Sequence, residues 1–80
     1  MPSGSPENIH IETMVGMFKV LDAKRVTVDM VAATAHIPRE FVEETMEKGR
    51  HFGFFGEVDD GAYELTPRGE RLLEEILIRN

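Results

Sequence analysis

The chain has 80 residues and a mass of 9.1 kDa, enough for one small domain with a single apolar core. Its 41% hydrophobic and 30% charged residues are typical of a soluble globular protein, and no apolar stretch is long enough to span a membrane. Because there is no cysteine, disulfides and thiolate zinc sites are excluded, and a reducing, cytoplasmic location is expected. The net charge of −6 disfavours non-specific binding to nucleic-acid phosphates.

The opening residues 1–7 are rich in Pro, Gly and Ser, which predicts a disordered tail ahead of one domain over residues 8–80. The first helix is expected from about Asn8 to Asp22, because apolar residues gather there on one helical face. This core-facing set is Ile11, Met14, Val15, Phe18 and Leu21. Glutamate is abundant and glutamine absent, a composition that favours a thermophilic source.

Two further helices are predicted on either side of a proline. Thr27 is the expected N-cap of a short helix that holds Val28, Met30, Val31, Ala32 and Ala35. Pro38 ends this segment, because the residue before a proline is pushed out of the helical region. Pro38 also suits the first turn of a third helix, from Arg39 to about His51, which Gly53 is expected to stop. The predicted core face of the third helix is Phe41, Val42, Thr45, Met46 and Gly49.

A β-hairpin is expected next, with strands Phe54–Val58 and Ala62–Leu65. A two-residue turn would place Glu57 opposite Glu64, which is a repulsive cross-strand pair. We therefore expect a three-residue loop, with Gly61 in the left-handed region and Glu57 opposite Tyr63.

The last predicted helix begins at Thr66-Pro67, as N-cap and first-turn proline. Its apolar stripe holds Leu72, Leu73, Ile76 and Leu77. Four small or apolar residues lie off the core stripes of the first and last helices: Ile9, Gly16, Val20 and Ile78. These four predict a contact face for a homodimer or for another protein.

From Thr27 to Ile76 the sequence resembles the winged helix-turn-helix superfamily, in the style of the MarR, ArsR and PadR regulators. Two stretches carry this resemblance: Ile37-Pro38 followed by Val42, Met46 and Gly53-Phe54-Phe55, and Tyr63-Glu64-Leu65-Thr66-Pro67-Arg68-Gly69 followed by Leu72-Leu73. The resemblance implies a mainly α fold with a small β-hairpin, in which a three-helix core carries a wing and a C-terminal helix. Gly49 departs from the pattern, which usually has leucine there; it either permits close packing or weakens the helix.

Most winged helices lay the third helix in the major groove of duplex DNA and set the wing against the backbone. Here the predicted outer face of that helix carries Glu40, Glu43, Glu44, Glu47 and His51, with Arg39, Lys48 and Arg50 at its margins. The predicted wing tip, Asp59, Asp60 and Gly61, is also acidic. Carboxylates repel phosphates, so this surface is unsuited to ordinary groove binding. The glutamates fit three interpretations: a solvated helix face, a docking surface for a basic protein, or an unusual DNA contact.

The leading hypothesis is therefore a protein-interaction or adaptor domain in a transcription- or replication-type assembly, with another protein or a second copy as partner. The alternative is a transcriptional regulator that binds duplex DNA. Besides the margins of the third helix, the candidate nucleic-acid contacts are Lys24, Arg25, Arg68 and Arg71, which either converge on one surface or are scattered.

No enzymatic activity, metal or cofactor is expected. The chain has no cysteine, no serine within the domain and no glycine-rich phosphate loop. Its histidines, His10, His36 and His51, share no metal-ligand spacing.

Overall fold

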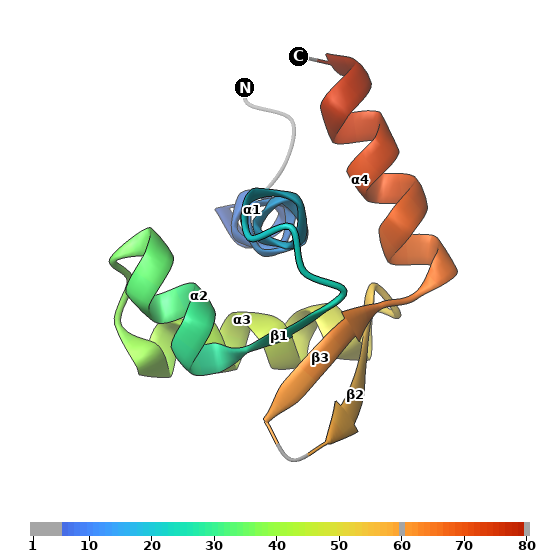
Figure 1. The fold of residues 1–80 in the computed structure, drawn as a ribbon. Helices are drawn as coiled ribbons and strands as arrows, with labels where there is room; N and C mark the ends of the chain where they lie inside the picture. Colours follow the sequence, from blue (N-terminus) through green and yellow to red (C-terminus); the bar gives the residue numbers. More distant parts are fainter. Residues whose placement is uncertain (1–5, 60, 80) are drawn as a thin grey trace.

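The computed structural model describes residues 6–59 and 61–79, with side chains from His10 onward (Figure 1). The elements in chain order are α1 (Pro6–Val20), β1 (Arg25–Thr27), α2 (Val28–Ala35), α3 (Arg39–His51), β2 (Phe55–Asp59), β3 (Ala62–Leu65) and α4 (Pro67–Arg79). Helix α1 packs against α3 on one side and α4 on the other, and the β2–β3 hairpin projects away from α1 (Figure 1). The architecture is the predicted one, a mainly helical winged helix-turn-helix.

Helix α1 is shifted towards the N-terminus from its predicted bounds: it begins at Pro6 and ends at Val20, whereas the sequence predicted about Asn8 to Asp22. A proline suits the first helical position, where its missing N–H has no partner to lose. The predicted core residues of α1 are buried except Leu21, which is half-buried, and Met17 joins them. Residues 6 and 7 of the expected tail belong to α1, and residues 1–5 lie outside the described residues.

Both predicted threonine caps are confirmed. The Thr27 hydroxyl accepts a hydrogen bond of 3.1 Å from a backbone N–H of α2, and the Thr66 hydroxyl accepts one of 3.1 Å from a backbone N–H of α4. Gly53 stops α3 with φ of +89°. Pro38 differs from its prediction: it is the N-cap of α3 rather than a residue of its first turn, because its ψ of 139° is extended.

The sheet contains a strand that the sequence did not predict. Strand β1 pairs antiparallel with β3, which gives the order β1-β3-β2. Strand β2 begins at Phe55 instead of Phe54, because the Phe54 N–H donates to the Gly49 carbonyl and so completes the end of α3. The predicted hairpin register is confirmed: Glu57 lies opposite Tyr63, and Gly61 has φ of +83°. A bulge between Glu57 and Asp59 accommodates the longer loop.

The Phe55 ring is the centre of the core between α1, α3 and the hairpin. It is 2% exposed, stacks on Phe18 at 5.8 Å and meets the Tyr63 ring edge-on at 6.5 Å. A Cβ at Gly49 would overlap this ring, so the glycine forms a notch on α3 in which Phe55 sits. Of the two interpretations of Gly49, the structure supports close packing.

Helix α4 is less buried than its sequence pattern predicted. Within α4 Gly69 alone is buried. It lies so close to the Phe54 backbone carbonyl that a Cβ there would overlap the carbonyl oxygen. The stripe residues Leu72, Leu73 and Ile76 are half-buried, and Leu77 is 48% exposed, since α4 packs on α1 along one side only. Met30 of α2, which was also predicted to face the core, is 37% exposed.

We expect Gly49→Ala to destabilise the fold by about 1–3 kcal/mol, because the new methyl group must displace the Phe55 ring from a filled core. Gly16→Ala is the matched control in α1, where a Cβ would have nothing within 4 Å. It should raise stability by about 0.5–1 kcal/mol through helix propensity alone. Urea unfolding of both variants measures this, and equal shifts would contradict the notch.

Candidate functional site

Helices α2 and α3 form one unit, in which α3 packs one side against the core and exposes its other side to solvent. His36 ends α2 in the left-handed region, at φ of +57°, and the next N–H, that of Ile37, donates to the Ala32 carbonyl at 3.2 Å. Val42 and Met46 of α3 are fully buried against α1 and α2. The opposite side of α3 is the element that a winged helix presents to a ligand.

The structure brings the predicted docking residues together on this outer side of α3. Glu40, Glu43, Glu44 and His51 are exposed, and Glu47 is half-buried. The side-chain carboxylates of Glu40 and Glu44 form no ion pair or hydrogen bond with another described residue. The carboxylates that would meet an approaching anion are therefore these two above all.

Two of the predicted nucleic-acid contacts on α3 already have carboxylate partners. Arg39 donates to Asp29 of α2 at 2.7 Å and lies 3.8 Å from Glu43. The hydrogen bond to Asp29 raises the pKa of Arg39 above its ordinary value. Arg50 donates to both carboxylate oxygens of Glu47, with a shortest distance of 2.8 Å. A phosphate would have to compete with these carboxylates for both guanidinium groups.

Glu47 also links α3 to the hairpin, which its place on the acidic face did not predict. The Tyr63 hydroxyl donates to Glu47 at 2.6 Å. The hydrogen bond from Arg50, followed by that from Tyr63, holds the pKa of Glu47 below its usual range. Burial, followed by the nearby carboxylate, raises the pKa of Tyr63. Glu47 therefore acts first as a structural clamp between α3 and β3.

The wing tip is acidic but partly neutralised from within the sheet. Asp59 is exposed and pairs at 2.9 Å with Arg25 of β1, which also pairs at 3.1 Å with Glu64 of β3. The Gly61 N–H donates to Glu57 at 3.2 Å and so braces the loop. The remaining predicted tip residue, Asp60, lies outside the described residues.

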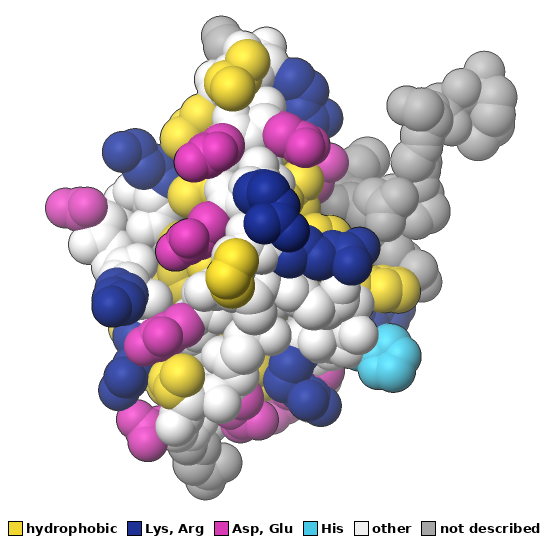
Figure 2. Space-filling model, turned by 90° about the vertical axis from the view of Figure 1, so that its right-hand side faces the viewer, with side chains coloured by type: hydrophobic (Ala, Val, Ile, Leu, Met, Phe, Trp, Pro, Cys, Tyr) yellow, Lys and Arg dark blue, Asp and Glu magenta, His cyan; other side chains and the backbone are white. Residues whose placement is uncertain are grey.

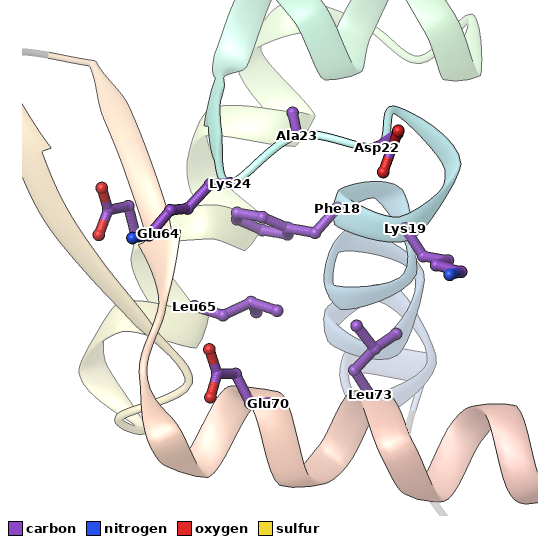
Figure 3. A pocket seen from close by; sticks show the side chains of 9 residues that line it. All are labelled: Phe18, Lys19, Asp22, Ala23, Lys24, Glu64, Leu65, Glu70 and Leu73. Atoms are coloured by element: carbon purple, nitrogen blue, oxygen red, sulfur yellow. The ribbon is translucent and has the colours of Figure 1, made fainter.

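The predicted nucleic-acid contacts that lie outside α3 and β1 divide between two places. Lys24 lines a hollow of about 330 Å³ where the end of α1 meets the start of α4 (Figure 3). The apolar residues that line this hollow include Phe18, Leu65 and Leu73. Three acidic residues also line it: Asp22, Glu64 and Glu70. Arg68 and Arg71 line a different hollow on α4. On the face that carries α4, acidic and basic side chains are interspersed (Figure 2). Among the described residues these cations do not gather into one basic face.

The residues of the predicted dimer face are spread along α1, with Ile78 near the end of α4. Val20 is 68% and Ile78 is 83% exposed, and Gly16 has open space around it. Arg79, the residue after Ile78, contacts Glu12 at 3.4 Å. Eight residues, or about 12 Å of helix, separate Glu12 from Val20, so Ile78 lies far from Val20. The side chain of Ile9 lies outside the described residues. The homodimer through these residues stays a prediction.

Among the side chains that the structure describes, in residues 10–59 and 61–79, no group of three His, Asp or Glu is placed to hold a metal ion. None of the helices described is both long and apolar enough to cross a bilayer.

A comparison with solved structures finds this fold in a larger protein. A crystal structure of a proposed transcriptional regulator protein from Pseudomonas aeruginosa superposes with a TM-score of 0.77 at 20% sequence identity. The match covers 96% of this chain and 61% of that chain, so the present chain spans less than two thirds of the regulator's length. No protein-family model and no curated protein sequence matches the chain.

We expect Tyr63→Phe to cost about 1–2 kcal/mol at neutral pH, because it removes a hydrogen bond to a charged carboxylate. Glu47 is 44% exposed, so solvent screening keeps the loss near the lower value. Since the pKa of Glu47 is lowered in the folded state, the ionised carboxylate stabilises the fold above about pH 4.3, and this contribution disappears as pH falls through the lowered pKa.

The difference in the free energy of unfolding between wild type and Tyr63→Phe should therefore become smaller at acidic pH. Urea unfolding near pH 7 and near pH 3 measures it, and an NMR titration should find the pKa of Glu47 higher in the variant. A Glu47 pKa that the substitution leaves unchanged would contradict the clamp.

Proposed function

We propose that this chain is the winged-helix domain of a transcriptional regulator. The observation that carries the proposal is the superposition of 96% of the chain, at a TM-score of 0.77, on a protein described as a proposed transcriptional regulator. The arrangement of α2, α3 and the hairpin supports it, because these are the elements with which winged helices contact their targets.

Duplex DNA is the first candidate target. In this mode α3 enters the major groove and the β2–β3 loop lies along the backbone. The carboxylates of Glu40 and Glu44 have no partner among the described residues, and a carboxylate in the groove accepts a hydrogen bond from the amino group of cytosine. The same carboxylates repel phosphates, so we expect weak non-specific affinity and a dependence on the base sequence.

A selection from a random duplex library tests this mode with wild-type protein at about 50 mM salt, where phosphate contacts are strongest. Recovery of a shared sequence motif that Arg39→Ala or Glu40→Gln abolishes supports DNA recognition by α3. A pool without a shared motif overturns it.

A protein partner is the second candidate target, and a specific feature of α3 favours it. At its C-terminal end an open hollow of about 340 Å³ is lined by Glu44, Glu47, Lys48, His51 and Phe52. Phe52 is 50% exposed, and the His51 ring lies edge-on to it at 6.0 Å. An exposed aromatic ring beside carboxylates suits a partner that presents apolar and basic side chains. In this mode the domain works as an adaptor in a transcription-type assembly.

The two modes make different predictions for the variant Glu40→Lys with Glu44→Lys. Replacing two carboxylates by two ammonium groups on the outer side of α3 should leave the fold intact, because both residues are exposed. If α3 contacts phosphates, affinity for random duplex should rise by about tenfold or more at 50 mM salt and fall steeply with added salt.

The matched control is Glu70→Lys with Glu74→Lys, which makes the same charge change at exposed positions of α4. Fluorescence anisotropy with a labelled duplex measures both variants. Equal gains would show that only net charge has changed, and no gain in either variant would exclude α3 from the groove and leave the adaptor mode.

A further inference from the structure

The arginines of this chain fall into two groups according to their partners. Arg25, Arg39, Arg50 and Arg79 each bond a carboxylate. Arg68 and Arg71 form no ion pair with any residue that the structure describes. In a chain with a net charge of −6, the two arginines without a carboxylate partner thus lie together, one turn apart near the start of α4.

These two arginines border one hollow of about 380 Å³, with Phe54, Leu72 and Glu75 as the other lining residues. The Arg68 guanidinium lies over the Phe54 ring, 4.9 Å from its centre, within the range of a cation–π contact. Phe54 and Leu72 are half-buried, so the hollow has an apolar floor beneath its cations. On the face that carries α4, Lys and Arg side chains meet near the middle, with apolar and acidic side chains around them (Figure 2).

Guanidinium groups bind carboxylates through paired, parallel hydrogen bonds. Because Arg68 and Arg71 are exposed, a free carboxylate ion would bind them only weakly in water. An occupant that also covers Phe54 and Leu72 gains apolar contact as well. A polyanion is disfavoured, because its closely spaced charges would meet Glu75 and the net charge of −6 as well as the two arginines. A protein segment can instead place a single carboxylate at the arginines and an apolar side chain beside it.

We propose that the hollow bounded by Phe54, Arg68 and Arg71 is a docking site for an acidic protein segment, which places an Asp or Glu carboxylate between the two guanidinium groups and a neighbouring apolar side chain over Phe54 and Leu72. This docking site goes beyond the proposed regulatory role and does not depend on it, because none of its lining residues belongs to α2, α3 or the loop of the wing.

The probe is an unlabelled peptide in a Gly/Ser background that carries alternating Leu and Glu, and its control peptide has Gln in place of Glu. NMR titration of the isotopically labelled protein follows the backbone amides and the arginine side-chain N–H signals. We expect the Glu peptide to shift the signals of Arg68, Arg71 and Phe54 and to leave those of Arg39 in place. The Gln peptide should give no such shifts.

The double variant Arg68→Gln with Arg71→Gln should bind the Glu peptide about tenfold more weakly or worse, the loss expected when a hydrogen-bonded charge pair is removed. The matched control is the double variant Arg25→Gln with Arg39→Gln. It also removes two positive charges, but from arginines that already bond carboxylates, and it should bind as wild type does. Glu75→Gln keeps both arginines and should bind a fewfold more tightly.

Several results overturn the proposal. One is the absence of shifts at about 1 mM peptide, which is the weak end of specific association. Another is an equal loss of binding in the control variant Arg25→Gln with Arg39→Gln, which would reduce the effect to net charge. Shifts of the same signals by duplex DNA at equal charge concentration would assign the cations to a polyanion. Shifts of the same size with sodium acetate would show that no segment is needed.

Discussion

The position of the wing depends on one contact, the seating of the Phe55 ring on the backbone of α3 at Gly49. A larger residue at Gly49 would move the ring, and the ring would take the first strand of the hairpin with it. The stacked Phe18 ring extends the contact into α1, and the hydrogen bond from Tyr63 to Glu47 ties the second strand to the same helix. Because packed interiors deform little, α3 and the hairpin behave as one rigid unit. A target that contacts both elements therefore meets a preformed surface.

The sequence predicted those parts of the fold that follow from local rules. Thr27 and Thr66 cap helices because their hydroxyls satisfy N–H groups three residues ahead, and the hairpin register follows from the repulsion that Glu57 and Glu64 would suffer in the alternative. Strand β1 has no such local signal. It has three residues, and it becomes a strand only because Val26 meets Tyr63 from a distant part of the chain.

The candidate site was predictable in composition but not in its pairings. Helical periodicity placed the glutamates on the outer side of α3 and left Arg39 at the margin, as the structure has them. That Arg39 bonds Asp29 depends on the angle between α2 and α3, which the sequence pattern does not specify. The same holds for Glu47, whose partner Tyr63 comes from the hairpin. The charge that α3 presents to solvent therefore depends on pairings that the sequence pattern does not specify.

The sheet order β1-β3-β2 has a consequence for solubility. An open strand edge offers unpaired N–H and C=O groups to other chains, and long, flat edges promote aggregation. Here one edge is β1, which is too short to template a strand. The other is β2, where the bulge bends the backbone and the exposed Glu57 and Asp59 carry like charges that a second copy would also bring. Both edges thus resist strand addition.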